Sequence, residues 1–214
     1  MSPRPLTLLS LFQRLFKHYG PQHWWPAESP FEVMVGAILT QNTAWINVER
    51  AIENLRRAEI LEPVAIAGLA TEQLARHLRP SGYFNVKAKR LQALCHWLLT
   101  EQSPESLETE TLRRRLLSIH GIGPETADDI LLYAYQRPVF VIDAYTRRLL
   151  SRLGLLDGGL SYEALRAIFE QVLPSDVALF NEYHALIDHH AKQVCRPKPT
   201  CEACFLRTRC PWPA

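Results

Sequence analysis

The sequence lacks any long apolar run. Nothing in its 214 residues approaches the ~18 to 20 uninterrupted apolar residues that a membrane-spanning helix needs. It also lacks the apolar core of a signal peptide, because residues 1–6 hold two prolines and one arginine and the segment behind them is amphipathic. These absences predict a cytoplasmic protein that has no contact with a membrane.

The sequence carries little net charge. It has 24 Lys and Arg against 22 Asp and Glu, a formal charge of +2, and 47% hydrophobic residues. These figures exclude a collagenous chain, an acidic disordered tail and a small disulfide scaffold. Basic residues still gather at 113–115, at 147–152 and at 192–210, where five of them stand against one acid. Such runs occur on nucleic-acid-binding surfaces and on solvated helices alike, so they leave the partner open.

Cysteine is rare until the end of the chain. Cys95 stands alone on a leucine-rich segment and is predicted to lie in the core. The other four occupy the last twenty residues: Cys195, Cys201, Cys204 and Cys210. A terminal group of this kind indicates a metal site rather than disulfides. Four thiolates in so short a span suit a [4Fe–4S] cluster or a structural zinc ion, and their spacing does not decide between the two.

The apolar pattern is that of helices. Alternating strand patterns are absent apart from Val139–Ile142, whereas apolar residues recur with the 3.6-residue period almost from end to end. Phe31–Leu39 is apolar on all sides, which predicts a buried helix. Ser29-Pro30-Phe31-Glu32 has the spacing of a capping box, and Ser103-Pro104 marks another helix start. We therefore predict an all-α protein of about ten helices.

The stretch Ile119–Ala127 predicts a hairpin between two helices. Gly121 and Gly123 allow a tight turn and a close approach of the backbone to another surface. The free N–H groups and the dipole at the start of the second helix then form an anion site. A DNA phosphate suits this site, although glycines that merely end a helix would look the same in isolation.

Three further segments accompany this hairpin. They are Val139–Arg148, an apolar run that delivers Asp143 to a helix start, Leu39–Thr43, and Gly82–Lys89. Together with the four-cysteine loop, the combination resembles the helix-hairpin-helix/GPD (endonuclease III) superfamily of DNA glycosylases over nearly the whole chain. The resemblance implies a two-domain helical fold with a C-terminal [4Fe–4S] loop. It further implies a monomer that binds double-stranded DNA with a damaged base and, in a prokaryote, associates with the nucleoid.

The resemblance also implies a domain arrangement. We expect an N-terminal helix within residues 1–28 that packs with the C-terminal domain, and a central domain over 29–139 whose hairpin spans about 112–135. The C-terminal domain is expected over 140–214, with the cluster loop at 195–210. DNA is then expected to enter between the two domains.

Asp143 is the predicted catalytic residue. Breaking an N-glycosidic bond develops positive charge on the deoxyribose, and a carboxylate beside C1′ stabilises that charge and orients the attacking water. Asp is also a favoured helix N-cap, and both roles are compatible.

Glu125 decides the subclass. Members of the superfamily that also cut the DNA strand have a lysine here, two residues past the second glycine, and its amine forms a Schiff base with the sugar. A carboxylate cannot do so, which predicts a monofunctional glycosylase unless another amine, such as Lys87 or Lys192, reaches the sugar. The setting of Glu125 most resembles the 3-methyladenine glycosylases, where Glu125 could read or neutralise the base.

Two tryptophans agree with that branch. Trp25 and Trp45 occupy the places at which it has aromatic residues that sandwich the extruded base. Stacking on indole faces suits a cationic base such as 3-methyladenine, although a single tryptophan is more often part of a core.

Further residues are predicted to contact DNA. Gln41, with Asn42 beside it, and either Tyr83 or Phe84 are candidates to fill the gap left by an extruded base, while a buried polar role is the alternative for Gln41. Lys87 and Lys89 are expected at phosphates or on a solvated helix face. The hairpin contributes His120, Gly121, Ile122 and Gly123.

For the four cysteines, the resemblance favours a [4Fe–4S] cluster over zinc, although the first gap is one residue shorter than the family's usual spacing. His184, His189 and His190 on the preceding helix are expected to make structural hydrogen bonds. Two alternatives to a monofunctional alkylpurine glycosylase remain. One is a glycosylase/lyase acting on oxidised pyrimidines, and the other is a non-catalytic protein that binds DNA structures.

Overall fold

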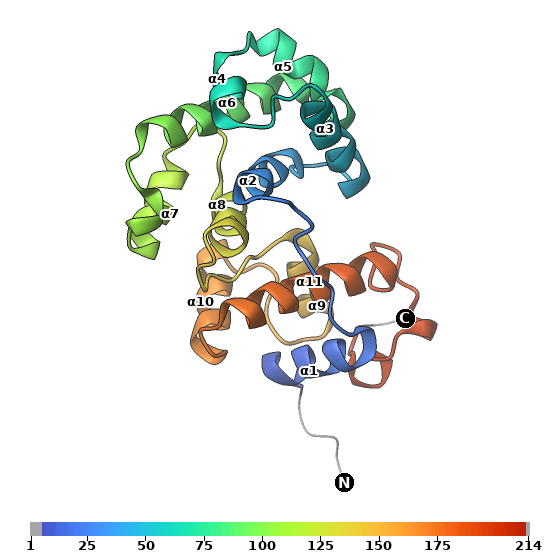
Figure 1. Ribbon diagram of the computed structural model, residues 1–214. Helices are drawn as coiled ribbons and strands as arrows, with labels where there is room; N and C mark the ends of the chain where they lie inside the picture. Colours follow the sequence, from blue (N-terminus) through green and yellow to red (C-terminus); the bar gives the residue numbers. More distant parts are fainter. Residues whose placement is uncertain (1–5, 213–214) are drawn as a thin grey trace. The chain divides into compact units, whose positions relative to one another are not determined.

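The computed structural model describes residues 6–212; residues 1–5, which belong to the segment predicted not to be a signal peptide, and residues 213–214 lie outside the described range. Over the described residues the backbone forms helices and short loops without any β-strand (Figure 1). The all-α prediction is therefore confirmed. The apolar run Val139–Ile142 is buried and has no regular secondary structure. Of the helices in residues 6–212, none has the length and apolar character that crossing a bilayer demands.

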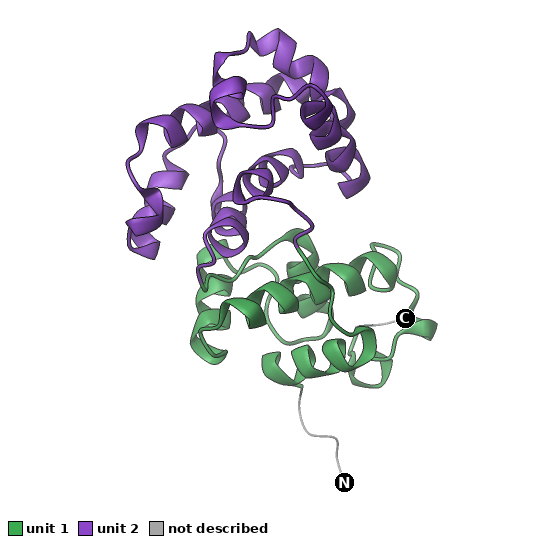
Figure 2. Ribbon diagram, viewed as in Figure 1, with its two compact units in different colours: residues 1–24, 138–214 green, residues 25–137 purple. Residues whose placement is uncertain are grey.

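The chain divides into two compact units (Figure 2). Unit 2 is one continuous stretch, residues 25–137, whereas unit 1 combines residues 1–24 with residues 138–214. The divisions therefore fall after residues 24 and 137.

Unit 2 is built around α2 (Pro30–Leu39), whose residues from Glu32 to Leu39 are all buried. It packs against α3, α6, α8 and η3. The other helical elements of unit 2 are α3 (Trp45–Arg57), α4 (Pro63–Gly68), α5 (Thr71–His77), η1 (Arg79–Ser81), α6 (Phe84–Thr100), η2 (Pro104–Ser106), α7 (Thr109–Leu117), α8 (Pro124–Asp129) and the π-helical η3 (Ile130–Ala134). Because α2 is apolar on every side, it is the element that the others enclose.

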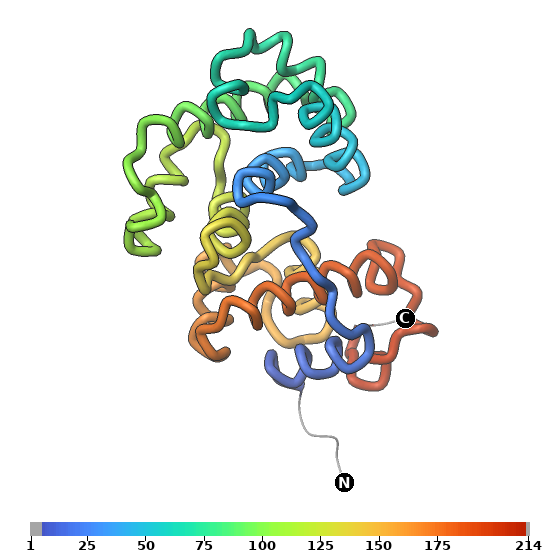
Figure 3. The backbone as a smooth tube through the Cα atoms, in the orientation of Figure 1, coloured from blue at the N-terminus to red at the C-terminus, as the bar shows by residue number. Residues whose placement is uncertain are grey.

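Unit 1 brings the two ends of the chain together. Its elements are α1 (Leu8–Tyr19), α9 (Ala144–Arg152), α10 (Tyr162–Val172), α11 (Val177–Gln193), η4 (Cys201–Ala203) and η5 (Arg207–Arg209). The long helix α11 packs against α1 and α9. Figure 3 shows α1, near the start of the chain, beside α11, near its end. Tyr183 of α11 donates a hydrogen bond to the Leu8 carbonyl oxygen at 2.8 Å, which ties α1 to α11.

Local signals set several helix starts. Ser29 caps α2 through the amide of Glu32, as its spacing predicts, but the Glu32 carboxylate accepts from the amide of Glu28 rather than from that of Ser29. The expected start at Ser103-Pro104 is only the short 3₁₀ turn η2, and α7 begins at Thr109 behind the cap Glu108. Cys95 is fully buried as predicted, and burial raises its pKa to about 12.

Candidate active site

Asp143 stands at the N-terminus of α9, directly after the buried extended segment. Its Oδ1 accepts a hydrogen bond from the backbone N–H of Thr146 at 2.7 Å, so its predicted capping role is confirmed. The side chain as a whole keeps 13% of its surface exposed. The cap holds one carboxylate oxygen in place and leaves the second for another partner.

That partner is His184 on α11. Its Nε2 lies 3.7 Å from Oδ2 of Asp143. Burial by itself raises the pKa of the Asp143 carboxyl, but His184 and the Thr146 amide outweigh it and hold the pKa below its ordinary value. Asp188 lies one turn further along α11; burial raises its pKa in spite of its 2.7 Å ion pair with Lys192. Unit 1 thus keeps Asp143 ionised. An ionised carboxylate is what the stabilisation of a positive charge requires.

The hairpin consists of α7, a turn over residues 118–123, and α8, which continues into η3. Gly121 has a φ of +88°, and a Cβ atom there would overlap the side chain of Arg90. The turn therefore requires glycine at this position. Ile122 is buried and anchors the turn, while His120 and Gly123 are exposed beside it.

Gln41 follows α2, and its side chain contacts the hairpin. Its Nε2 donates to the Gly121 carbonyl oxygen at 3.2 Å and to Oγ1 of Thr126 at 2.9 Å, and its Oε1 accepts from Arg90. The neighbouring Asn42 is exposed and has a φ of +55°. The structure shows Gln41 in the hydrogen-bonded state that the sequence left as its alternative role, and insertion into DNA stays a prediction.

Of the two aromatic candidates before α6, Tyr83 is the one presented to solvent. It is 72% exposed and has a left-handed backbone with a φ of +45°. Phe84 is partly buried, and the guanidinium of Arg79 lies 5.9 Å from the centre of its ring. Tyr83 is therefore the better placed of the two to reach DNA.

Lys87 corrects a prediction. Its side chain is buried, and its Nζ donates to the carbonyl oxygens of Leu39 at 2.9 Å and Ser81 at 2.7 Å, so it does not lie at the surface where it could contact a phosphate. Burial lowers its pKa to about 8. Because one ammonium binds both carbonyls, Lys87 holds the end of α2 to the end of η1. Lys89 is exposed, and its contact with phosphate stays a prediction.

Trp25 and Trp45 lie together, but not as a sandwich. Their ring centres are 5.3 Å apart at an interplanar angle of 85°, so one ring edge meets the other's face. A base between two indoles needs parallel rings about 7 Å apart, twice the normal contact distance. Trp25 is held against α2, where a Cβ on Gly36 would come within 3.0 Å of it, and Tyr133 lies 5.1 Å from it on another side. Trp45 instead borders a surface pocket of about 450 Å³.

Glu125 lies on the first turn of α8 and is exposed. The arginines of the first two basic runs differ among themselves: Arg114 and Arg115 are exposed, whereas Arg113 and Arg147 make contacts within the fold. Arg113 is buried and binds Asp128 through two hydrogen bonds of 2.6 and 3.1 Å, which clamps α7 to α8. Arg147 donates to the carbonyl oxygen of Leu160 at 2.6 Å. These arginines hold the fold.

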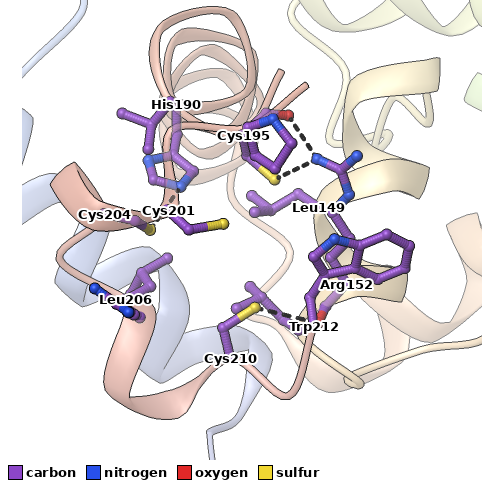
Figure 4. Close-up of a pocket in the computed structure, with 13 residues that line it drawn as sticks. Leu149, Arg152, His190, Cys195, Cys201, Cys204, Leu206, Cys210 and Trp212 are labelled. Atoms are coloured by element: carbon purple, nitrogen blue, oxygen red, sulfur yellow. Dashed lines mark hydrogen bonds between the residues drawn. The ribbon is translucent and has the colours of Figure 1, made fainter. Parts of the chain in front are cut away.

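The four cysteines line one pocket of about 160 Å³ in unit 1, called here the cysteine pocket (Figure 4). Burial raises the pKa of Cys204 and Cys210, and the other cysteines of the pocket add to the increase. A single zinc ion bound at about 2.3 Å would bring the sulfurs within roughly 4 Å of one another. Among residues 6–212, no three His, Cys, Asp or Glu side chains are so arranged that they could hold one ion. The possible donors are the four thiols that line the cysteine pocket.

The family model for the HhH-GPD superfamily of base excision DNA repair proteins matches residues 35–175. The chain belongs to this superfamily. A proposed DNA repair glycosylase of Methanocaldococcus jannaschii is 46% identical over 209 residues, which are 95% of either chain. Endonuclease III of Thermotoga maritima is 28% identical over 94% of this chain and 90% of its own. The protein is therefore a base excision repair DNA glycosylase.

Solved structures of other DNA glycosylases have the same fold. The H. pylori 3-methyladenine DNA glycosylase bound to 1,N6-ethenoadenine superimposes with a TM-score of 0.74 at 32% identity, over 88% of this chain and 98% of that one. A non-covalent endonuclease III–DNA complex superimposes with a TM-score of 0.82 at 20% identity, over 96% of both chains. The two-domain helical glycosylase fold predicted from the sequence is confirmed.

Two arginines of this glycosylase have a role that the sequence did not reveal. Arg148 donates to the carbonyl oxygens of Cys195 at 2.8 Å and Ala191 at 3.1 Å. Arg152 donates to the Arg196 carbonyl at 2.6 Å and lies 3.4 Å from Sγ of Cys195. Helix α9 therefore begins at Asp143 and ends against the cysteine loop. Basic residues one turn apart on a helix were the only signal, and it did not distinguish a brace from a DNA contact.

Proposed function

We propose that this protein is a monofunctional DNA glycosylase that hydrolyses the N-glycosidic bond of alkylated purines such as 3-methyladenine, without AP lyase activity. The observation that carries the proposal is Glu125, exposed on the first turn of α8. Superfamily members that cut the strand have a lysine at the matching place. A carboxylate has no amine to condense with the sugar, so the Schiff base of the lyase reaction cannot form there.

Asp143 supplies the central charge of this reaction. As the bond between C1′ and the base nitrogen breaks, its electron pair leaves with the base and positive charge spreads over the sugar. The ionised carboxylate, held by Thr146 and His184, stabilises that charge and orients the water whose oxygen bonds to C1′. The water's proton passes to the carboxylate or to solvent. An alkylated purine cation leaves readily, so no strong general acid is needed.

The alkylpurine preference rests on the aromatic residues and on the likeness to the H. pylori enzyme. Indole faces attract a cationic ring, and Trp25 and Trp45 are already in contact. Because Trp25 is packed against α2 while Trp45 borders a pocket, we assign the movement that admits a base to Trp45. Edge-to-face contact then gives way to stacking on both sides of the base.

The DNA surface of this proposal lies on unit 2. The hairpin turn offers exposed backbone at Gly123 and the side chain of His120 for a phosphate. Gln41 and Tyr83 each follow by two residues a helix end that Lys87 binds, and they fill the space of the extruded nucleotide. For Gln41 this requires release from Thr126 and Gly121.

The cofactor we propose for the cysteine pocket is a [4Fe–4S] cluster bound by Cys195, Cys201, Cys204 and Cys210. Four thiols that line one pocket suit the four iron atoms of such a cluster, and Leu149 and Leu206 add apolar walls. When bound, the cluster supplies a rigid cross-link for the loop, and no redox step is assigned to base release. Arg196, Lys198 and Arg207 of this loop are exposed.

The test incubates the protein with duplexes that carry 3-methyladenine, hypoxanthine, thymine glycol or uracil, and compares strand breaks with and without alkali. We expect release of the base from the duplex that carries 3-methyladenine, and strand breaks only after alkali. Breaks without alkali, together with a borohydride-trapped protein–DNA adduct, would contradict the monofunctional assignment. Release from thymine glycol alone would contradict the alkylpurine assignment.

A second candidate is a glycosylase/lyase for oxidised pyrimidines. The 28% identity to endonuclease III over 94% of this chain favours it. In that case Lys192, which is exposed although paired with Asp188, is the amine to test, since Lys87 is buried. Adduct trapping that disappears in Lys192→Met would establish this route.

A further inference from the structure

His190 of α11 lies between the first helix of the protein and the cysteine pocket. Its side chain is 1% exposed and lines the pocket (Figure 4). Nδ1 of its ring is 2.8 Å from the hydroxyl oxygen of Tyr19, the last residue of α1. Nε2 on the opposite side of the ring is 3.7 Å from Sγ of Cys204. One imidazole therefore connects a phenol to a cysteine sulfur across three segments of unit 1.

The chemistry of a bound cluster decides which way this chain of hydrogen bonds runs. A cysteine that ligates iron is a thiolate, which can only accept a hydrogen bond. Nε2 of His190 must then carry the proton and donate it towards sulfur. In a neutral imidazole this leaves Nδ1 as an acceptor, so the Tyr19 hydroxyl donates to it. The partner on one ring nitrogen thus selects the tautomer that serves the other.

We propose that His190 is a positioning residue that donates a hydrogen bond to the Cys204 sulfur of the iron–sulfur cluster, and that Tyr19 holds it in the donating tautomer. The inference rests on the proposed cluster and adds a function for the pair, namely control of the cluster's reduction potential. Hydrogen bonds to the sulfurs set the potential of such clusters. A donor stabilises the reduced form, because that form carries one more negative charge.

Surrounding rings explain why the arrangement is rigid. Phe205, next to Cys204, lies edge-on to His190 with the ring centres 5.5 Å apart. It also stacks on His18 with the ring centres 4.0 Å apart. Tyr19 in turn contacts His189 at 4.6 Å. The rings leave His190 little freedom to turn away from the sulfur. The rings also provide a matched control, His189, which is adjacent to His190 and contacts Tyr19. Among the described contacts, the ring nitrogen within hydrogen-bond distance of the Cys204 sulfur belongs to His190 and not to His189.

The experiment compares His190→Phe, Tyr19→Phe, the double variant and the control His189→Phe in the full-length protein without DNA. Each change keeps an aromatic ring in place and removes nitrogen or hydroxyl groups. Iron content and visible absorbance are measured first. The one-electron couple is then titrated by spectroelectrochemistry, with the electrode supplying the electron.

We expect His190→Phe to lower the reduction potential. At a fixed electrode potential the ratio of reduced to oxidised cluster should fall about tenfold, which corresponds to a shift of about 59 mV for a one-electron couple. Tyr19→Phe shifts it in the same direction by less, and has no effect in the His190→Phe background, because Tyr19 acts through His190. His189→Phe leaves it unchanged.

Three results overturn the inference. A brown His190→Phe protein with the wild-type potential shows that the donor does not reach the sulfur. Iron lost from His190→Phe, with an unchanged potential in Tyr19→Phe, shows a purely structural role. A colourless wild-type protein that holds zinc refutes the proposed cofactor itself, and absorbance alone distinguishes this result from the other two.

Discussion

The two units hold their predicted functional residues by different means. In unit 1, the predicted or proposed functional groups lie at or near the ends of helices. Asp143 caps α9, Arg152 ends the same helix against the cysteine loop, and His190 lies near the end of α11. In unit 2, polar side chains that are buried or partly buried hold helices, helix ends and turns to one another. Lys87 joins the ends of α2 and η1, Gln41 contacts the hairpin, and Arg113 binds Asp128 within the hairpin.

The difference suggests a division of labour. Helix ends fix a charge to within a fraction of an ångström, which chemistry at one bond requires. Loops held by a few polar contacts keep their positions but can open, which inserting side chains into DNA requires. Substitutions in unit 1 should therefore change the rate of base release, and substitutions in unit 2 should change recognition or the stability of the loops.

Asp143→Asn is expected to have the largest effect. The amide still caps α9, so folding and DNA binding should persist, while single-turnover base release falls by about 10²- to 10³-fold or more because the negative charge is lost. The matched control is Asp176→Asn, since Asp176 caps α11 with the same 2.7 Å bond and is exposed. A rate of base release by Asp143→Asn within a few-fold of the wild-type rate would contradict the proposed division of roles between the two units.

Trp45→Ala should weaken recognition rather than the chemical step. Stacking of a base on an aromatic ring contributes about 1–3 kcal/mol, so binding to a duplex with an alkylated purine should weaken by about 5- to 150-fold. Affinity for undamaged DNA should change little. Trp97→Ala is the control, because Trp97 is a half-buried tryptophan on α6 of the same unit. Equal losses for both variants in fluorescence anisotropy would rule out a base-binding role for Trp45.

His184→Asn tests how unit 1 sets the charge of Asp143. His184 helps to hold the pKa of Asp143 below its ordinary value, so the acid limb of the rate profile should lie at low pH in the wild type. Without His184, burial raises that pKa, the carboxylate is protonated at higher pH, and the acid limb moves upward. Single-turnover rates across pH measure this shift. His189→Asn on the same helix should leave the profile in place.

Lys87→Met is expected to have the smallest effect, and it concerns the stability of unit 2. Burial lowers the pKa of Lys87 to about 8, below the value of about 10.4 in an unfolded chain. Between these values the unfolded state binds more protons, so the free energy of unfolding should rise with pH from about 8 towards 10, by at most about 1.4 kcal/mol per pH unit. Urea unfolding should show this rise in the wild type and lack it in Lys87→Met. A parallel pH dependence of the two proteins would contradict the buried position of the ammonium.

The features that the sequence predicts well depend on neighbours along the chain. The caps Ser29 and Asp143 each bind an amide three residues ahead, and the tight turn at Gly121 follows from local sterics. The helical pattern likewise repeats within a few residues. Ser103-Pro104 begins only the short 3₁₀ helix η2, because a local start signal does not show whether a full helix follows.

What the sequence by itself determined is therefore the helical fold, the hairpin, the position of Asp143 at a helix start and the grouping of four cysteines near the C-terminus. Only the tertiary structure decided that Lys87 is a buried brace, that His184 stands beside Asp143, that two tryptophans meet edge to face, and that Tyr19 reaches His190. Apart from the Lys87–Ser81 bond, these contacts join residues 20 to 171 positions apart. No periodicity or spacing encodes them, because they arise only when separate helices pack and bury a polar or aromatic group against a particular neighbour.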